Sequence, residues 1–236
     1  MKKLLVLLLI GGVVSFTRAE TITVQKLQGE VSVRHGVTEV WTTVRVGDLL
    51  KPDDTIKTGK RGSAVILARV DQNAQSTDKR ITLPAEVIVD MSDIRNLSPE
   101  ELMLKLTMEK VRASSYQWKN DELHIPNATV VHGADRSAGP AMQEDNPETG
   151  RLEWNGARVL YNNAFYSTCA LKSLELFRRY PSLNMLFENR WMAAQALEKA
   201  DLRGEALEQY GTLLTAGNLT PAQESLVRAR IGSLRK

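Results

Sequence analysis

Apolar and polar side chains alternate between Thr21 and Asp90, and helical spacing replaces this pattern in the rest of the chain. A period of two places every second side chain on one face of a β-strand. Glycine, proline and aspartate interrupt the pattern at short intervals, as expected where antiparallel strands turn back. Its apolar members are Ile22, Val24, Val31, Val33, Val44, Val46, Ile56, Val65, Leu67, Ile81, Leu83, Val87 and Val89. The pattern predicts a small antiparallel β-sandwich or roll.

A helix is predicted next, from Pro99 to about Arg112. Ser98 can cap it, proline suits its first position, and Glu101 lies three residues after the cap. We expect one broad apolar face of this helix to dock on the sheet. That face consists of Leu102, Met103, Leu104, Leu106, Met108 and Val111. Residues 20–113 are therefore assigned to a β domain with a following helix.

The remaining residues divide into two parts. Residues 114–150 are predicted to be an irregular segment and linker, because Gly139-Pro140 and Asn146-Pro147 break any regular pattern. Residues 151–236 return to helical spacing, with Thr220 to Gln223 forming a capping box before a last helix. The chain as a whole is expected to be α+β, with the sandwich or roll first and a helical array last.

Within residues 151–236, small and apolar residues fall where two helices of a pair would touch. The first set is Ala157, Leu160, Tyr166, Cys169, Leu176 and Pro181, and a second set follows 37 residues later at Ala194, Leu197, Ala206, Tyr210 and Leu213. This arrangement resembles tetratricopeptide helix pairs, whose period is about 34 residues. The resemblance implies stacked helix pairs with a concave face that binds peptide segments.

The first 19 residues resemble a secretory signal peptide. Lys2 and Lys3 precede an apolar stretch from Leu4 to Val14, and Thr17-Arg18-Ala19 resembles a cleavage site. About eleven apolar residues are fewer than the roughly twenty that a membrane-spanning helix needs. We expect a protein that is periplasmic or otherwise extracytoplasmic after cleavage, with no retained transmembrane anchor.

Cleavage at that point would change the charge balance. The chain has 31 Lys and Arg against 28 Asp and Glu, and the segment holds three of the bases and none of the acids. The remaining chain would be balanced at 28 of each. A nucleic-acid-binding protein usually carries a basic excess that displaces counterions from phosphates. Nucleic acid is therefore not an expected partner.

The β region also resembles a known family. The pieces that carry the resemblance are, in order, Gly29-Glu30-Val31-Ser32-Val33-Arg34, Trp41, Val46-Gly47-Asp48-Leu49-Leu50, Asp54-Thr55-Ile56-Lys57-Thr58-Gly59 and Ser63-Ala64-Val65-Ile66-Leu67. In this order they resemble a FecR-like extracytoplasmic domain. Such domains in sigma-factor regulators are joined to a cytoplasmic region and a membrane helix, which are not recognisable here. The resemblance therefore implies a stand-alone interaction module, or a signal-sensing module without the regulator's cytoplasmic part.

No catalytic, metal or cofactor site is predicted. Cys169 is the only cysteine, and its place in a helix pair favours a buried, inert thiol. His35, His124 and His132 lack the spacings of known hydrolases and zinc sites. The polar run that begins at Asp71 lacks the glycine and glutamate of a calcium loop.

We therefore expect a non-enzymatic, exported protein that binds or scaffolds other envelope proteins. Aromatic anchors dominate many interfaces, which makes Trp118, Trp154, Phe165 and Trp191 the candidate partner-binding residues. The alternative is a cell-wall glycan-binding protein in which Trp41 and Trp118 stack on sugars.

Overall fold

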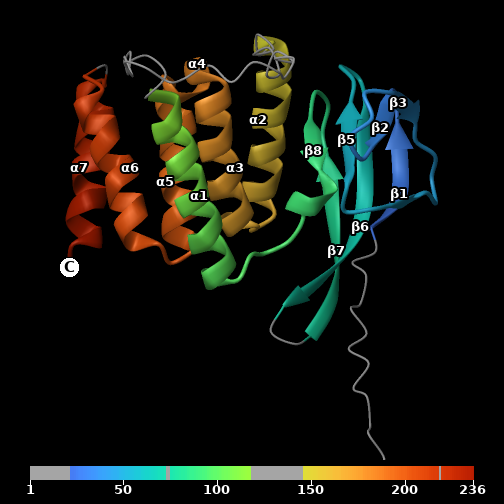
Figure 1. The fold of residues 1–236 in the computed structure, drawn as a ribbon, viewed down its shortest axis with the longest axis horizontal. Helices are drawn as coiled ribbons and strands as arrows, with labels where there is room; N and C mark the ends of the chain where they lie inside the picture. The colour runs from blue at the N-terminus through green and yellow to red at the C-terminus, as the bar shows by residue number, and fades with distance from the viewer. Residues whose placement is uncertain (1–21, 73–74, 118–145, 218) are drawn as a thin grey trace, which may run out of the picture.

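A computed structural model describes residues 22–72, 75–117, 146–217 and 219–236 (Figure 1). The proposed signal segment, Trp118, His124 and His132 lie outside these residues. The described chain is α+β, with antiparallel sheets in the first half and helices in the second, as the sequence predicts.

Eight strands form two four-stranded sheets within the described residues. One sheet has the order β4-β1-β6-β7, and its strands are Leu49–Leu50 (β4), Ile22–Gln28 (β1), Ser63–Gln72 (β6) and Gln75–Leu83 (β7). The other has the order β3-β2-β5-β8, and its strands are Trp41–Thr43 (β3), Val31–His35 (β2), Asp54–Thr58 (β5) and Ile88–Asp90 (β8). Every pair is antiparallel. Residues such as Val24, Ile66, Val33 and Ile56 from both sheets share one apolar core.

Two glycines allow neighbouring turns of this β region to touch. A Cβ on Gly29, whose φ is +64°, would lie 2.3 Å from the Arg61 carbonyl oxygen, and one on Gly62 would lie 2.1 Å from the Glu30 carbonyl oxygen. No larger residue fits at either position without moving the backbone. Gly47, in the turn before β4, also has a positive φ, of +94°.

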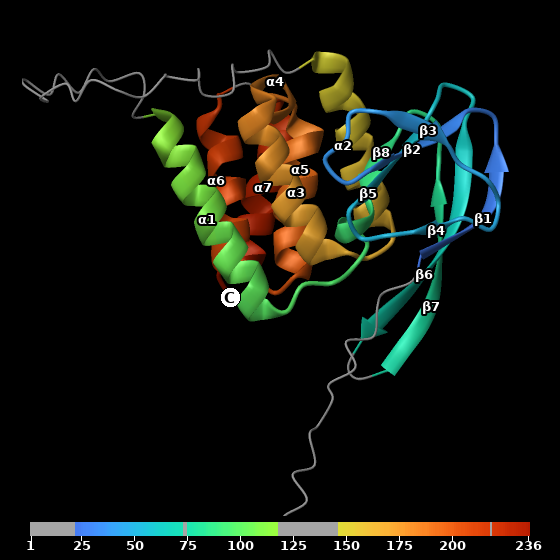
Figure 2. The same cartoon turned by 45° about the vertical axis from the view of Figure 1, so that its right-hand side comes forward.

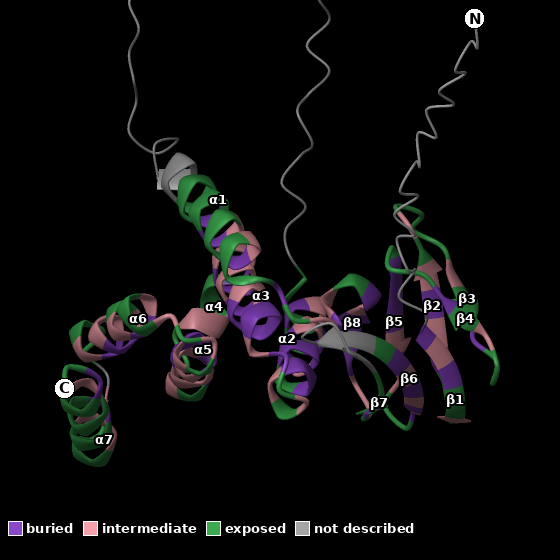
Figure 3. Ribbon diagram, turned by 90° about the horizontal axis from the view of Figure 1, so that it is seen from below, coloured by how far each residue is buried: buried purple, intermediate pink, exposed green. Residues whose placement is uncertain are grey.

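Helix α1, Pro99–Gln117, follows a short 3-10 turn, η1, at Met91–Asp93. The predicted cap is confirmed, because the Ser98 hydroxyl accepts a hydrogen bond from the Glu101 amide at 3.2 Å. The expectation that α1 docks on the sheet is wrong, since the helix packs against α3, Tyr166–Arg179. Figure 3 shows exposed residues along α1. Of the predicted face, only Leu102 and Leu106 are buried; Met103, Leu104, Met108 and Val111 are exposed.

The C-terminal helices form a row beside the sheets (Figures 1 and 2). After α2, Pro147–Asn162, and α3 come α4, Pro181–Asn184; α5, Phe187–Lys199; α6, Arg203–Thr215; and α7, Pro221–Leu234. Contacts link α2 to α3, α3 to α5, α5 to α6 and α6 to α7. Helix α2 begins four residues before the predicted boundary at 151, because Asn146 caps it and Pro147 occupies its first position.

Most of the residues predicted at helix contacts are buried, including Ala157, Leu176, Ala194 and Tyr210. The capping box of α7 is also confirmed, with Thr220 and Gln223 bonded to each other's backbone. Val227 and Leu234 of this helix are buried, whereas Leu226 is exposed.

Candidate functional site

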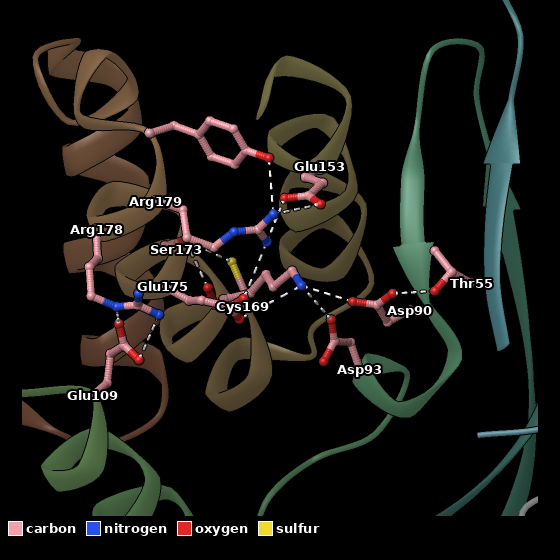
Figure 4. Close-up of polar contacts among 12 residues, drawn as sticks. Thr55, Asp90, Asp93, Glu109, Glu153, Cys169, Ser173, Glu175, Arg178 and Arg179 are labelled. Carbon is pink, nitrogen blue, oxygen red and sulfur yellow. Dashed lines mark hydrogen bonds and ion pairs between the residues drawn. The ribbon is translucent and has the colours of Figure 1, made fainter. Parts of the chain in front are cut away.

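Several charged side chains gather at the joint between the sheets and the helices (Figure 4). Lys172 of α3 lies 2.8 Å from Asp90, 3.7 Å from Asp93 and 3.7 Å from Glu175. Asp90, at the end of β8, also accepts a hydrogen bond from the Thr55 hydroxyl at 2.7 Å. Lys172 therefore links α3 to β8, to η1 and, through Asp90, to β5.

Burial shifts the pKa values in this joint. It raises the pKa of Asp93 to about 6, because Lys172 only partly offsets the loss of solvent and Asp90 adds a like charge. Burial also raises the pKa of Glu153, whose carboxylate lies 3.0 Å from Arg179. Burial opposes the charge on Lys172, but the carboxylates of Asp93 and Asp90 outweigh it and raise the pKa of the amine.

Close backbone packing completes the joint. Helix α2 approaches β8 so closely that a Cβ on Gly156 would lie 2.0 Å from the Ile88 carbonyl oxygen. The side-chain amide of Asn155 donates a hydrogen bond to the Glu86 carbonyl oxygen at 2.8 Å. The backbone amide of Leu97 donates one to the Ser167 hydroxyl at 2.9 Å. These contacts are structural, since they use the polar groups of both parts to hold one against the other.

A groove of about 400 Å³ lies on the helical side of the molecule, between α1 and α6. Residues of α3, α4 and α5 complete its lining, which includes Leu174, Phe177, Pro181, Ala113 and Thr212. Its volume is within the range of ligand pockets, and such pockets combine a mainly apolar lining with a few polar groups.

Two ion pairs tie α1 to the groove's other walls. Buried Glu109 of α1 accepts a hydrogen bond from Arg178 of α3. Lys110 of α1 lies 3.1 Å from Glu208 of α6, and both of these side chains are exposed. Arg190 of α5 also lines the groove, and its side-chain hydrogen bond goes to the neutral amide oxygen of Asn184.

The aromatic residues proposed as partner anchors lie elsewhere. Trp154 and Phe165 are 5% and 0% exposed, so a partner could reach neither ring without opening the core. Trp191 is partly buried between Phe187 and Tyr210, with ring centroids 5.7 and 5.0 Å away. The structure brings none of these three residues into the groove.

Trp41, proposed to bind glycan, is partly exposed on β3. The Arg34 guanidinium lies 5.3 Å from the ring centroid and the Lys57 amine 5.6 Å away. A hollow of about 260 Å³ lies beside the ring and is also lined by Ser32, Thr42 and Thr43.

The side chains that could act as an acid, a base or a nucleophile are either buried or engaged in structural contacts. The Cys169 thiol is fully buried, and burial raises its pKa to about 12. His35 Nδ1 lies 2.7 Å from Asp54 Oδ1, while Asp54 Oδ2 accepts a hydrogen bond from the Lys51 amide at 2.8 Å. Within the described ranges, no group of three or more His, Cys, Asp and Glu residues is placed to hold a metal ion. No helix in those ranges has the length and apolar character to cross a membrane.

Sequence reasoning missed the groove. The local sequence feature that points to the groove is Glu109. It follows Leu102 and Leu106 at helical spacing and so lies on the buried face of α1. An acid there requires a basic partner on the element that covers it. The sequence does not show that this partner is Arg178.

No family model matches the chain, and neither a curated protein nor a solved structure matches it. The geometry of the groove and of the Trp41 hollow is therefore the guide to function.

Proposed function

We propose that this chain is a non-enzymatic, exported interaction module in which the groove between α1 and α6 holds a segment of another protein. The observation that carries the proposal is the groove itself, which joins an apolar lining to charged residues at its walls. Envelope or periplasmic proteins are the proposed partners, because of the signal-like segment at residues 1–19.

The resemblances to known families support the same role. In this proposal the β region is FecR-like and the helices α2 to α7 are tetratricopeptide-like. Contacts between successive helices and buried small residues such as Ala157, Ala194 and Ala206 support the second resemblance. The β region would then position the array, since Lys172 and Gly156 hold the two parts together.

The test is to fill the groove without disturbing the core. Ala113 is exposed on α1 and lines the groove, so Ala113→Trp would occupy part of its volume. Ala222→Trp, on the exposed surface of α7, is the matched control. Proteins retained from an envelope extract of the source cells would be compared by mass spectrometry. The proposal is supported if Ala113→Trp loses specific partners that the unaltered chain and Ala222→Trp both retain. It is contradicted if the unaltered chain and both variants retain the same partners equally.

A second candidate function, glycan binding, is favoured by the Trp41 hollow. The partly exposed Trp41 ring and three neighbouring hydroxyl groups are a combination that suits sugars. The test is a titration of the full chain with soluble cell-wall fragments, followed by tryptophan fluorescence. A change that disappears in Trp41→Phe supports this function, and an unchanged spectrum at saturating fragment rejects it.

A further inference from the structure

The charges that line the groove are unevenly paired. Glu109 is paired with Arg178, and Lys110 with Glu208. Arg190 has no carboxylate partner among the described residues, because its side chain donates only to Asn184. These five residues carry three positive and two negative charges, which leaves one positive charge at Arg190.

Arg190 is also partly removed from water. Its side chain is half-buried, and burial holds the pKa of the guanidinium below its usual range. A guanidinium has five donors in a planar fork that fits a carboxylate in a two-point contact. A desolvated cation without a counter-ion is costly, and a bound carboxylate would relieve that cost.

The surroundings restrict the anion that fits. Glu109 and Glu208 line the same groove, so a dianionic phosphate would face two like charges, whereas a single carboxylate matches the single excess positive charge. Apolar surface continues beside the site, because Met185 and Leu186, between Asn184 and Arg190 in the chain, are 74% and 52% exposed. A ligand with both an acidic group and apolar side chains would use both features.

We infer that the groove recognises a protein segment in which an acidic side chain, bound by Arg190, stands next to apolar side chains that cover Phe177 and Leu174. This inference rests on the proposed function and specifies the chemistry of the partner. Arg190 supplies selectivity for the acid, and the apolar lining supplies contact area.

The experiment uses three pools of labelled, C-terminally amidated 12-residue peptides. Each peptide carries two leucines and, after the second, an aspartate, an asparagine or a lysine; the other positions are alanine, serine or glycine. Binding to the full chain is followed by fluorescence anisotropy. We expect the aspartate pool to bind about tenfold more tightly than the asparagine pool, as for a charge-assisted hydrogen bond.

Two arginine variants test whether Arg190 causes the preference for the aspartate pool over the asparagine pool. Arg190→Gln should abolish it, and Arg203→Gln, an exposed position on α6 outside the groove, should retain it. Arg190→Gln should not lower the melting temperature, because it removes a partly desolvated cation that pairs with no carboxylate in the part of the chain that the structure describes. A marked loss would instead indicate a structural role and overturn the inference. Equal binding of the aspartate and asparagine pools, or a preference that persists in Arg190→Gln, would also overturn it.

The Ala113→Trp variant separates the two proposals. If the pools bind equally and Ala113→Trp abolishes all binding, the groove is a binding site and only the acidic specificity is rejected. If no pool binds the unaltered chain, both the inference and peptide binding by the groove are rejected.

Discussion

At the residue scale, the close approach of α2 to β8 depends on the missing side chain of Gly156. The Ile88 carbonyl oxygen lies 2.0 Å from where a Cβ would stand, and this oxygen belongs to the backbone and cannot rotate away. A methyl group at this position must therefore push the helix from the strand.

We predict that Gly156→Ala lowers the free energy of unfolding by about 2 kcal/mol, the usual cost of overpacking a tight contact. Gly211→Ala, in the interior of α6 where nothing lies within 4 Å of the added Cβ, is the matched control. It should raise stability by up to about 1 kcal/mol through helix propensity alone. Urea denaturation of both variants measures the difference, and equal stability would show that α2 does not approach β8 so closely.

At the element scale, α1 is held by one buried and one exposed ion pair. Glu109 is 7% exposed in its side chain and Arg178 is 24% exposed, whereas Lys110 and Glu208 are both more than half exposed. Removal of one partner from a buried pair leaves the other charge without compensation, but an exposed pair contributes little.

Glu109→Ala is therefore predicted to destabilise the protein by about 3 kcal/mol, and Lys110→Ala by less than about 1 kcal/mol. Adding Arg178→Met to Glu109→Ala should recover part of the loss, because it removes the uncompensated guanidinium. Chemical denaturation of the single and double variants gives the coupling energy. Additive effects of the two changes would mean that α1 and α3 are not joined by this pair.

At the scale of the whole molecule, the joint should respond to pH. The pKa of Asp93 is raised by burial to about 6, above its ordinary value, so the folded state holds a proton that the unfolded state releases near pH 4. The resulting contribution to stability is fully present below about pH 4 and is lost as the pH rises through 6.

Asp93→Asn is predicted to abolish the loss of stability that occurs as the pH rises through 6. The unfolding free energy of the variant, relative to the unaltered chain, should rise by about 2 kcal/mol between pH 4 and pH 7.5. Asp53→Asn, at an exposed position in the β4–β5 turn, is the control. Denaturation curves at several pH values measure this difference, and a constant difference across the range would contradict the account.

The sequence predicts local features of the fold better than it predicts the contacts between elements. The capping residues Ser98 and Thr220 are local signals, and the structure confirms them. Alternation predicts strands, which the structure shows, but in β6 it predicts the wrong buried face: Ala64, Ile66 and Ala68 are buried, whereas Val65 and Leu67 are only partly buried. Val46, also predicted on a buried face, is 62% exposed. The docking of α1 is not local, because the apolar face of a helix does not specify which surface will cover it. Lys172 and Asp90 are likewise 82 residues apart, and only the tertiary fold brings them together.

The candidate site depends even more on tertiary structure. The sequence predicts aromatic anchors, but Trp154 is buried against Phe177 of α3, and Phe165 is buried with the Lys79 amine over its ring. Arg190 has no distinguishing mark in the sequence, since its lack of a carboxylate partner among the described residues becomes visible only when the neighbouring helices are in place. The proposed function is therefore assigned to the groove and not to the aromatic residues that the sequence predicts as anchors.

Site-specific photocross-linking in the source cells tests this account most directly. A photoreactive residue at Thr212, which lines the groove, is compared with one at Arg203, which is exposed outside it on the same helix. We predict a defined protein adduct from position 212, absent from position 203 and lost when Ala113→Trp is added. Adducts of equal yield at both positions, or an adduct at 212 that survives Ala113→Trp, would contradict binding in the groove.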